Sequence, residues 1–437
     1  MKKILTILAI ACVAFVFTGC QKDVPNKFIV ELRSVGKEIP NPNITPERCI
    51  PEGAEATLES IRYIPGHPIY YMDYTANVDW GSLLTDNNLP LYGMYYLTSK
   101  VTNALFNYIP GPTNTDKIQG NACSGFICYN KKGELLNCRN YDGDYGEMVV
   151  VFNRNVKPGE HKSVMMTDLN AAQKYSNTGG YNGDNVLLRG GIDLNVLLRQ
   201  PISTVDGMND AGLVITSYQL PNFNDRNDPT IDPFPNVTPR PFAVDQNTGK
   251  TRIGVSGLHI LALTKCATVQ DVIDLFRSYD FTTLDRNLNV HWCVSDANNN
   301  WKTLEYWVGS DGRDSLYVFD ENARAHSANL SSHNVGYEYL SMENYYYNPI
   351  PAATWSMDFW QRDFGGVVRA QNMMDHYSPI MDEVAALFCL QYGNFGIEEP
   401  GQVTNWSCVY NAKQRTILFN VRDDMSQAFT IDLKKDL

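Results

Sequence analysis

The sequence predicts a layered α+β fold for the part of the chain that follows residue 120. Three hairpin-like units occur there, with polar turns at residues 131–133, 209–212 and 296–300. Helix-like runs at residues 257–263, 268–278 and 380–390 lie between and after them. Several of the strand-like runs are apolar on both faces, which predicts sheets that are covered on both sides.

The first twenty residues have the pattern of an export signal. Lys2 and Lys3 are followed by an apolar stretch over residues 4–17, and Phe17-Thr18-Gly19-Cys20 resembles a lipobox. The apolar stretch is short for a membrane-spanning helix. We therefore expect a bacterial lipoprotein, exported and anchored to the outer membrane by lipid on Cys20, on its periplasmic or cell-surface side. The alternative is an ordinary signal peptide with a coincidental cysteine.

Residues 21–122 are expected to form a tether that runs into an extension. Residues 21–60 are polar and proline-rich, whereas residues 61–110 are rich in tyrosine and include a predicted helix over residues 91–106. The run Pro110-Gly111-Pro112-Thr113-Asn114 is a strong loop signal and places the main boundary just after it. The predicted organisation is a signal at 1–20, an extension at 21–122 and a main domain at 123–437.

The composition of the 437 residues is that of a globular protein, with 43% hydrophobic and 19% charged residues. Its formal net charge is −12, and no basic stripe interrupts the acidic balance. Clamping of nucleic-acid phosphates depends on Lys and Arg. A nucleic acid is therefore not an expected partner.

Eight cysteines follow Cys20, and in an exported protein an even number invites disulfides. Their spacing argues against a framework, because they are neither clustered nor arranged as C-x-x-C pairs. Four of them lie in apolar runs and are expected to be buried free thiols; they are Cys128, Cys138, Cys266 and Cys293. Cys49 is the exception, since a bridge to Cys389 or Cys408 would fasten the extension to the main domain.

The sequence lacks the common signatures of cofactor, metal and serine-triad chemistry. It contains no G-x-S-x-G, no Walker A motif, no G-x-G-x-x-G and no H-E-x-x-H. Residues 296–300 begin like a calcium loop, but Trp301 occupies the position that needs glycine. No cofactor and no metal are expected.

The first hairpin carries the candidate chemistry. If residues 123–130 pair with residues 134–142 around Lys132, Cys123 lies opposite Tyr141 and Arg139 lies on the same sheet face as Cys123. A cation near the sulfur favours the nucleophilic thiolate. Asp142 is expected beside the backbone nitrogen of Cys123, where its carboxylate could orient an amine. The alternative is a buried cysteine on an ordinary hairpin with a surface arginine and aspartate.

These residues resemble the choloylglycine hydrolase group of N-terminal-nucleophile amidases, which includes bile salt hydrolases and penicillin V acylases. In that family the nucleophilic cysteine is the N-terminus of the mature chain, its α-amine is the base, and an Arg and an Asp follow at the spacing of Arg139 and Asp142. The resemblance implies a four-layer αββα sandwich of two antiparallel sheets. The extension is similar to that of acid ceramidase-like relatives, which implies self-cleavage between Ala122 and Cys123.

Further blocks of the resemblance follow in the family's order. The block Asp206-Gly207-Met208-Asn209-Asp210-Ala211-Gly212-Leu213 and the later hairpin from His291-Trp292 to Glu305 match family motifs. The resemblance implies roles in the oxyanion hole for Asn329 and for Gln219, which stands where the family has an asparagine. Arg362 and Arg369 both compete for the family's late arginine, and Arg369 is the candidate carried forward.

The resemblance implies an enzyme that hydrolyses linear amides through a thioester on Cys123. N-acyl amides such as bile salt conjugates or N-acyl amino acids are the expected small-molecule substrates. A homo-oligomer is a further possibility. Two alternatives stay open: a non-catalytic surface lipoprotein that binds a glycan or a hydrophobic ligand through its aromatic residues, and an inactive relative.

Overall fold

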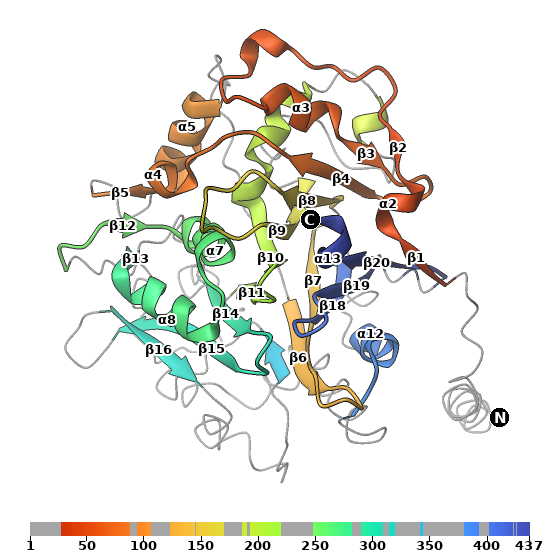
Figure 1. Ribbon diagram of the computed structural model, residues 1–437, viewed down its shortest axis with the longest axis vertical. Helices are drawn as coiled ribbons and strands as arrows, with labels where there is room; N and C mark the ends of the chain where they lie inside the picture. The colour runs from red at the N-terminus through yellow and green to blue at the C-terminus, as the bar shows by residue number, and fades with distance from the viewer. Residues whose placement is uncertain are drawn as a thin grey trace, which may run out of the picture.

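Figure 1 shows the computed structural model of the chain, which describes residues 28–87, 94–105, 123–144, 146–169, 186–189, 193–219, 248–281, 290–308, 314–319, 341–343, 380–392, 402–422, 424 and 426–437. No helix within these ranges is long and apolar enough to cross a bilayer. The export signal and Cys20 lie outside the described residues.

One of the two large sheets has seven strands, and it includes the strand that begins at Cys123, the first residue of the main domain. Its strands, in spatial order, are β1 (Ile29–Glu31), β20 (Ala428–Asp432), β19 (Thr416–Val421), β18 (Gln402–Asn411), β7 (Leu135–Asp144), β6 (Cys123–Tyr129) and β17 (Ser341–Glu343). All neighbours pair antiparallel except β1 and β20, which are parallel.

A ten-stranded sheet faces it. In spatial order it contains β16 (Asp314–Phe319), β15 (Trp301–Val308), β14 (Val290–Ser295), β11 (Val214–Gln219), β10 (Thr204–Asn209), β9 (Ser163–Asp168), β8 (Met148–Asn153), β4 (Ile69–Tyr74), β3 (Arg62–Tyr63) and β2 (Lys37–Glu38). Only β4 and β8 run parallel within it. Three short strands form a separate small sheet; they are β13 (Asp280–Phe281), β12 (Arg252–Ile253) and β5 (Thr85–Asp86).

Three hydrophobic cores separate four layers. One core fills the space between the two large sheets, where Val150, Tyr218 and Trp406 are fully buried. A second lies between the ten-stranded sheet and the helices α7 (Val255–Lys265) and α8 (Val269–Ser278). The third lies between the seven-stranded sheet and α12 (Glu383–Tyr392). The predicted α+β fold, a four-layer αββα sandwich of two sheets, is therefore confirmed (Figure 1).

The extension is folded wherever the structure describes it. Proline content suggested a tether over residues 21–60, but from residue 28 onward this stretch adds strands to both large sheets. Its helices and single turns are α2 (Leu32–Val35), η2 (Pro46–Arg48), α3 (Ala54–Glu59), α4 (Trp80–Leu84) and α5 (Met94–Leu105), the last within the helix predicted over residues 91–106. The remaining described helices are η3 (Val186–Arg189), η4 (Leu194–Ser203) and α13 (Leu433–Asp436).

Helix α8 shows how local sequence sets an element. Its buried residues follow a helical period, with Val269, Val272, Ile273 and Phe276 turned to the core. Thr268 caps the helix, because its side chain accepts from the backbone N–H of Asp271 and the Asp271 carboxylate accepts from the backbone N–H of Thr268.

Replacing Thr268 with alanine should lower the free energy of unfolding by about 1 kcal/mol, because one N–H at the helix start loses its acceptor. Urea unfolding followed by circular dichroism would measure the loss. Thr268→Ser keeps the acceptor and should retain most of the stability. An equal loss in both variants would contradict the capping role.

All eight described cysteines are free thiols. Cys128, Cys138, Cys266 and Cys293 are buried, as predicted. The suggested bridge from Cys49 to Cys389 or Cys408 is wrong: Cys49 lies beside η2, where its sulfur accepts from Asn195 Nδ2 at 3.1 Å, while Cys408 is buried between the sheets.

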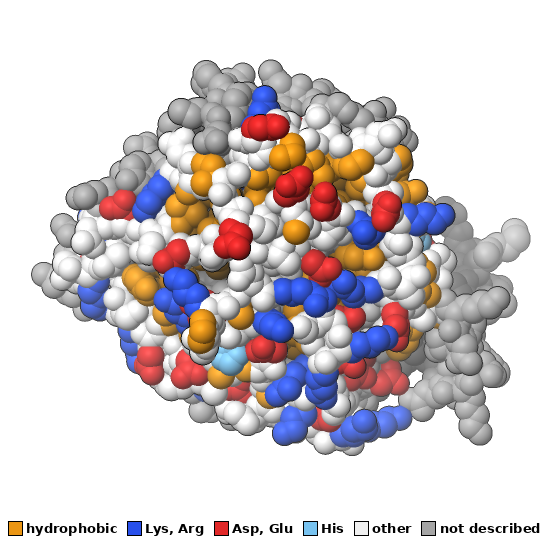
Figure 2. All heavy atoms as spheres, turned by 45° about the horizontal axis from the view of Figure 1, so that its top comes forward, with side chains coloured by type: hydrophobic (Ala, Val, Ile, Leu, Met, Phe, Trp, Pro, Cys, Tyr) orange, Lys and Arg blue, Asp and Glu red, His pale blue; other side chains and the backbone are white. Residues whose placement is uncertain are grey.

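The surface in Figure 2 carries charges of both signs. Acidic and basic side chains are interspersed over the face turned to the viewer, with hydrophobic side chains between them.

Candidate active site

The hairpin of β6 and β7 places Cys123 and Arg139 together. Cys123 pairs with Tyr141 and Gly125 pairs with Arg139, which is the register predicted from the turn at Lys132. Arg139 reaches diagonally along the face between the two sheets, and its Nη2 donates to Cys123 Sγ at 3.4 Å. Both side chains are buried, with Cys123 3% and Arg139 0% exposed.

Arg139 is held by groups from the opposite sheet. Its Nη1 donates to Asp206 Oδ2 on β10 at 2.8 Å, and its Nη2 also donates to the carbonyl of Ser217 on β11 at 2.9 Å. Burial lowers the pKa of Arg139, yet the charges of Asp206 and Cys123 raise it well above its usual value. Burial raises the pKa of Asp206, and the guanidinium opposes that rise. The guanidinium is therefore a fixed positive charge beside the sulfur.

Cys123 is held as a neutral thiol in the continuous chain. Burial raises its pKa, Arg139 lowers it, and the carboxylate of Asp142 raises it again. The backbone N–H of Asp142 donates to the sulfur and favours the thiolate, but the net direction is upward. A base that removes the thiol proton would therefore be needed for attack at neutral pH.

A bulge in β18 positions the groups around Asp142. The register between β18 and β7 shifts by one residue between Thr404 and Trp406. Thr404 thereby lies opposite Asp142, and its Oγ1 donates to Asp142 Oδ1 at 2.5 Å. Asn405, the extra residue, accepts from the backbone N–H of Gly146 at 2.8 Å. Bulges re-aim side chains in this way next to active sites.

Aromatic rings form the wall next to Arg139. Tyr141 and Trp406 are stacked with ring centroids 4.2 Å apart, and Arg139 Cζ lies 5.0 Å from the Tyr141 centroid. Trp406 Nε1 also approaches Asp206 Oδ2 at 3.5 Å. The centroid of the Tyr218 ring lies 5.6 Å from Arg139 Cζ. Rings over a guanidinium add cation–π attraction and limit its rotation.

Gly125 leaves the space that Tyr218 needs. A Cβ on Gly125 would lie 2.4 Å from the Tyr218 hydroxyl oxygen and 2.4 Å from the backbone oxygen of Cys138. The ring could move, but the backbone oxygen belongs to the paired strand β7 and would have to shift with it.

Gly125→Ala should therefore cost about 1–3 kcal/mol of stability through overpacking and lower catalytic turnover by about 100-fold through a displaced Arg139. Urea unfolding and steady-state kinetics would measure the two effects. Gly81→Ala is a matched control, because its Cβ would meet only side-chain atoms at 3.4–3.5 Å. Equal effects of the two substitutions would contradict this account of Gly125.

Comparison with known families decides the class of this site. A sequence profile of the linear amide C–N hydrolases, choloylglycine hydrolase family, matches residues 123–359. This chain belongs to the choloylglycine hydrolase family. The match begins at Cys123, the residue that the hairpin places beside Arg139.

Three solved structures are similar to this choloylglycine hydrolase family member. Two are variants of the conjugated bile acid hydrolase from Clostridium perfringens, each at 16% identity over 72% of this chain and 93% of that one, with TM-scores of 0.42 and 0.43. The third is penicillin V acylase from Agrobacterium tumefaciens, at 15% identity, 72% and 87% coverage and a TM-score of 0.39. No curated protein sequence matches the chain significantly.

Of the predicted site residues, the choloylglycine hydrolase scaffold brings together Cys123, Arg139 and Asp142. Gln219 is the last residue of β11, opposite Val290, and only its backbone is described. Asn329, Arg362 and Arg369 lie outside the described residues, so their roles stay predictions. The position of the Asp142 carboxylate relative to the backbone nitrogen of Cys123 also stays a prediction.

Sequence reasoning missed two residues beside Arg139 in this choloylglycine hydrolase family member: Asp206, its ion-pair partner, and Trp406, which approaches Asp206 and stacks on Tyr141. Asp206 was noticed only as the first residue of the block that ends at Leu213, and Trp406 was not noticed. The sequence did indicate a buried ion pair at Asp206, because this acidic residue lies inside a strand-like run just before a turn. A charge in such a place needs a buried partner of opposite sign. Within the described residues, no group of three His, Cys, Asp or Glu side chains is arranged to hold a metal ion.

Proposed function

We propose that the protein hydrolyses the amide bond of small N-acyl amides, with bile salt conjugates or other N-acyl amino acids as the substrate class. The observation that carries the proposal is the buried contact of 3.4 Å between Arg139 Nη2 and Cys123 Sγ. Membership of the family of linear amide C–N hydrolases supplies the reaction type. What we propose beyond the reaction type is the substrate, that is, which acyl amide is hydrolysed.

Self-cleavage would generate the missing base. Cys123 Sγ attacks the carbonyl carbon of Ala122, the peptide C–N bond breaks, and the acyl group passes to sulfur, while the nitrogen takes up the thiol proton and becomes the α-amine of Cys123. Water then hydrolyses this thioester, which leaves a carboxylate on Ala122 and a free thiol on Cys123. The new α-amine has a pKa near 8. This amine is suited to act as the base because the Cys123 thiol is neutral and needs a neighbouring group that removes its proton.

Amide hydrolysis would use the same groups. The α-amine of Cys123 accepts the thiol proton, the sulfur attacks the substrate carbonyl, and the ammonium returns the proton to the departing amine. Arg139 stabilises the thiolate electrostatically. Asn329 and Gln219 are proposed to donate to the oxyanion, and Arg369 is proposed as the late active-site arginine of the family. Water then releases the acyl group as a carboxylic acid.

We also propose that the enzyme works outside the cytoplasm, attached to the outer membrane through lipid on Cys20. The charged start, apolar stretch and lipobox-like run of the first twenty residues support this location. Radiolabelled palmitate incorporation that is lost in Cys20→Ala would test it. An equally labelled alanine variant would contradict lipidation at this residue.

The deciding experiment is intact-mass measurement and N-terminal sequencing of the purified protein, followed by a substrate panel. We expect a new chain that begins at Cys123. The cleaved protein should release amine and acid in equal amounts from a glycine-conjugated bile acid or an N-acyl amino acid, and penicillin V serves as the comparison substrate. An uncut chain without turnover on any of the three would contradict the proposal.

A further inference from the structure

The extension is built into the same sheets that hold the candidate active site. Strand β4 pairs with β8 over six residues, from Ile69 opposite Met148 to Tyr74 opposite Asn153. Strand β1 pairs with β20 over three residues. Both pairings are parallel, and they are the only parallel ones in the described part of the two large sheets.

Side chains of the extension are part of the cores of the main domain. Tyr70, Met72 and Tyr74 alternate with Ile69 and Tyr71 along β4, so that the strand contributes to the cores on both faces of its sheet. The Tyr74 hydroxyl donates to the carbonyl of Leu198 at 2.8 Å, within a fully buried environment. Other buried residues of the extension in these cores are Leu32, Ile39, Ala54, Leu58, Ile61, Ile64, Ala76, Trp80, Leu84, Val101 and Leu105.

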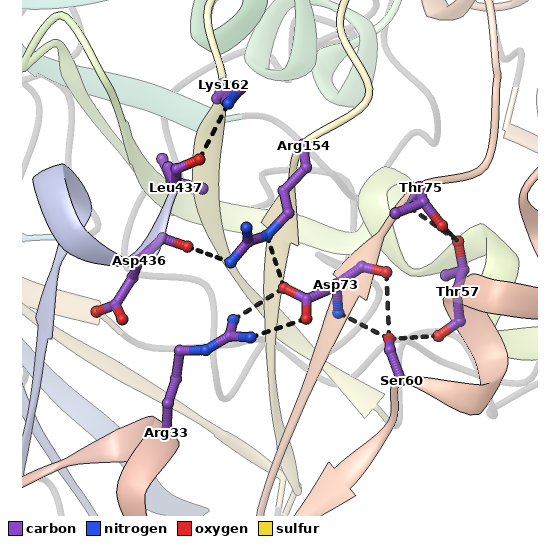
Figure 3. Close-up of polar contacts among 9 residues, drawn as sticks. All are labelled: Arg33, Thr57, Ser60, Asp73, Thr75, Arg154, Lys162, Asp436 and Leu437. Atoms are coloured by element: carbon purple, nitrogen blue, oxygen red, sulfur yellow. Dashed lines mark hydrogen bonds and ion pairs between the residues drawn. The ribbon is translucent and has the colours of Figure 1, made fainter.

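A charged cluster joins the extension to the C-terminal helix (Figure 3). Asp73 on β4 accepts two bonds from Arg33 at 2.8 Å each and one from Arg154 Nε at 2.7 Å. Arg154 also donates to the backbone carbonyl of Asp436, and Lys162 donates to that of Leu437 at 3.0 Å. Burial raises the pKa of Asp73, but the bonds and charges of the two arginines outweigh it and hold the pKa below its usual value. The carboxylate is therefore ionised between two cations at neutral pH.

A second polar contact lies where η2 meets η4. Arg48 Nη1 pairs with Asp193 Oδ2 at 2.7 Å. The backbone N–H of Thr45 donates to Asn195 Oδ1 at 2.9 Å, and Asn195 Nδ2 donates back to the carbonyl of Thr45 at 3.0 Å. Within its described residues, the extension is thus fixed at positions distributed from Ile29 to Leu105.

From these contacts we infer that the extension remains in the mature enzyme as a second, non-covalently bound subunit. The inference rests on the proposed cleavage between Ala122 and Cys123. That cut breaks one peptide bond and none of the strand pairings, core contacts or ion pairs above. The surface that retains the subunit consists of β8, β20, η4 and α13, and its partner is the segment from β1 to α5.

The first test separates this inference from self-cleavage itself. In a Cys123→Ala chain, which cannot cut itself, a site-specific protease sequence replaces residues 112–117 and is cleaved by the added protease. We expect the two pieces to elute together in size-exclusion chromatography and to separate only in urea. An uncut wild-type chain would count against the proposed function alone, whereas separate elution of the nicked pieces under native conditions would overturn the inference.

A second test locates the contact. In the nicked protein, Asp73→Asn should raise the dissociation constant of the two pieces at least tenfold, because Arg154, on the other side of the boundary, loses its charged acceptor. Glu31→Gln is the matched control: Glu31 pairs across the same boundary with Lys435, but the two side chains are 61% and 60% exposed, and solvent screens the pair. Equal effects of the two substitutions would overturn the assignment of the Asp73 cluster as a principal contact.

In the uncut chain, Asp73→Asn should leave the extension associated at every protein concentration, because the covalent link keeps the partners at a high effective concentration. Urea unfolding of nicked and uncut forms, each at two protein concentrations, measures this difference. The midpoint should depend on concentration only after nicking. A midpoint that is independent of concentration in both forms would contradict a separable subunit.

Discussion

Replacing Cys123 with alanine should abolish amide hydrolysis while leaving the fold intact. The sulfur is the proposed nucleophile, and loss of a nucleophile commonly costs a factor of about 10⁴–10⁶ in turnover. The substitution removes one buried atom from the contact with Arg139 and leaves the guanidinium bound to Asp206 and Ser217. Substrate kinetics, intact mass and circular dichroism together would check the expectation.

Cys128→Ala is the control for this variant. Cys128 lies on the same strand and is also fully buried, but it belongs to the core between the seven-stranded sheet and α12. Its loss should lower stability slightly through a small cavity and preserve both turnover and the new N-terminus. An alanine variant at position 123 that still hydrolyses amides would remove the basis of the proposed mechanism.

Removing Asp206 should have the largest effect on stability. Asp206→Ala leaves the guanidinium of Arg139 without its carboxylate partner at a site where both side chains are at most 1% exposed. Breaking a buried ion pair by removing one partner typically costs about 3–5 kcal/mol. Asp210→Ala, four residues along the chain, removes a surface pair with His161 and should cost far less.

The paired replacement of Arg139 by methionine and Asp206 by leucine tests the cause of that loss. Apolar groups of similar size remove both charges at once, so the double variant should be more stable than either single variant. Activity should not return, because the cation beside Cys123 is gone. A double variant no more stable than Asp206→Leu would show that packing, not the unpaired charge, determines the loss. Urea unfolding of the wild type, Arg139→Met, Asp206→Leu and the double variant completes the cycle.

The hairpin at Cys123 could be predicted because its determinants are local. The turn at Lys131-Lys132-Gly133 needs a left-handed residue, which Gly133 supplies at φ 71°, and it sets the register of the two strands. A slip of one residue would have moved Arg139 to the other face of the sheet. The turn and the two-residue alternation of side chains along a strand were therefore enough to predict that Arg139 lies near Cys123.

The ion-pair partner of Arg139, and the tryptophan that approaches this partner, could not be predicted in the same way. Asp206 is 67 residues from Arg139 along the chain, and Trp406 is 200 residues beyond Asp206. Their meeting depends on how two sheets stack and on a bulge at Asn405, neither of which a local pattern encodes. The extension was misjudged near its start for a related reason, because proline content alone does not reveal short strands such as β1 that complete a distant sheet.

The two parallel pairings have a practical consequence for recombinant production. A chain started at Cys123 would lack β1 and β4 and would leave the backbone groups of β20 and β8 without their neighbours. Open edges of this kind template association with other chains, and β8 is apolar along its length from Met148 to Phe152. A truncated product of this design would tend to form insoluble aggregates, and its lack of activity would say nothing about the chemistry of Cys123.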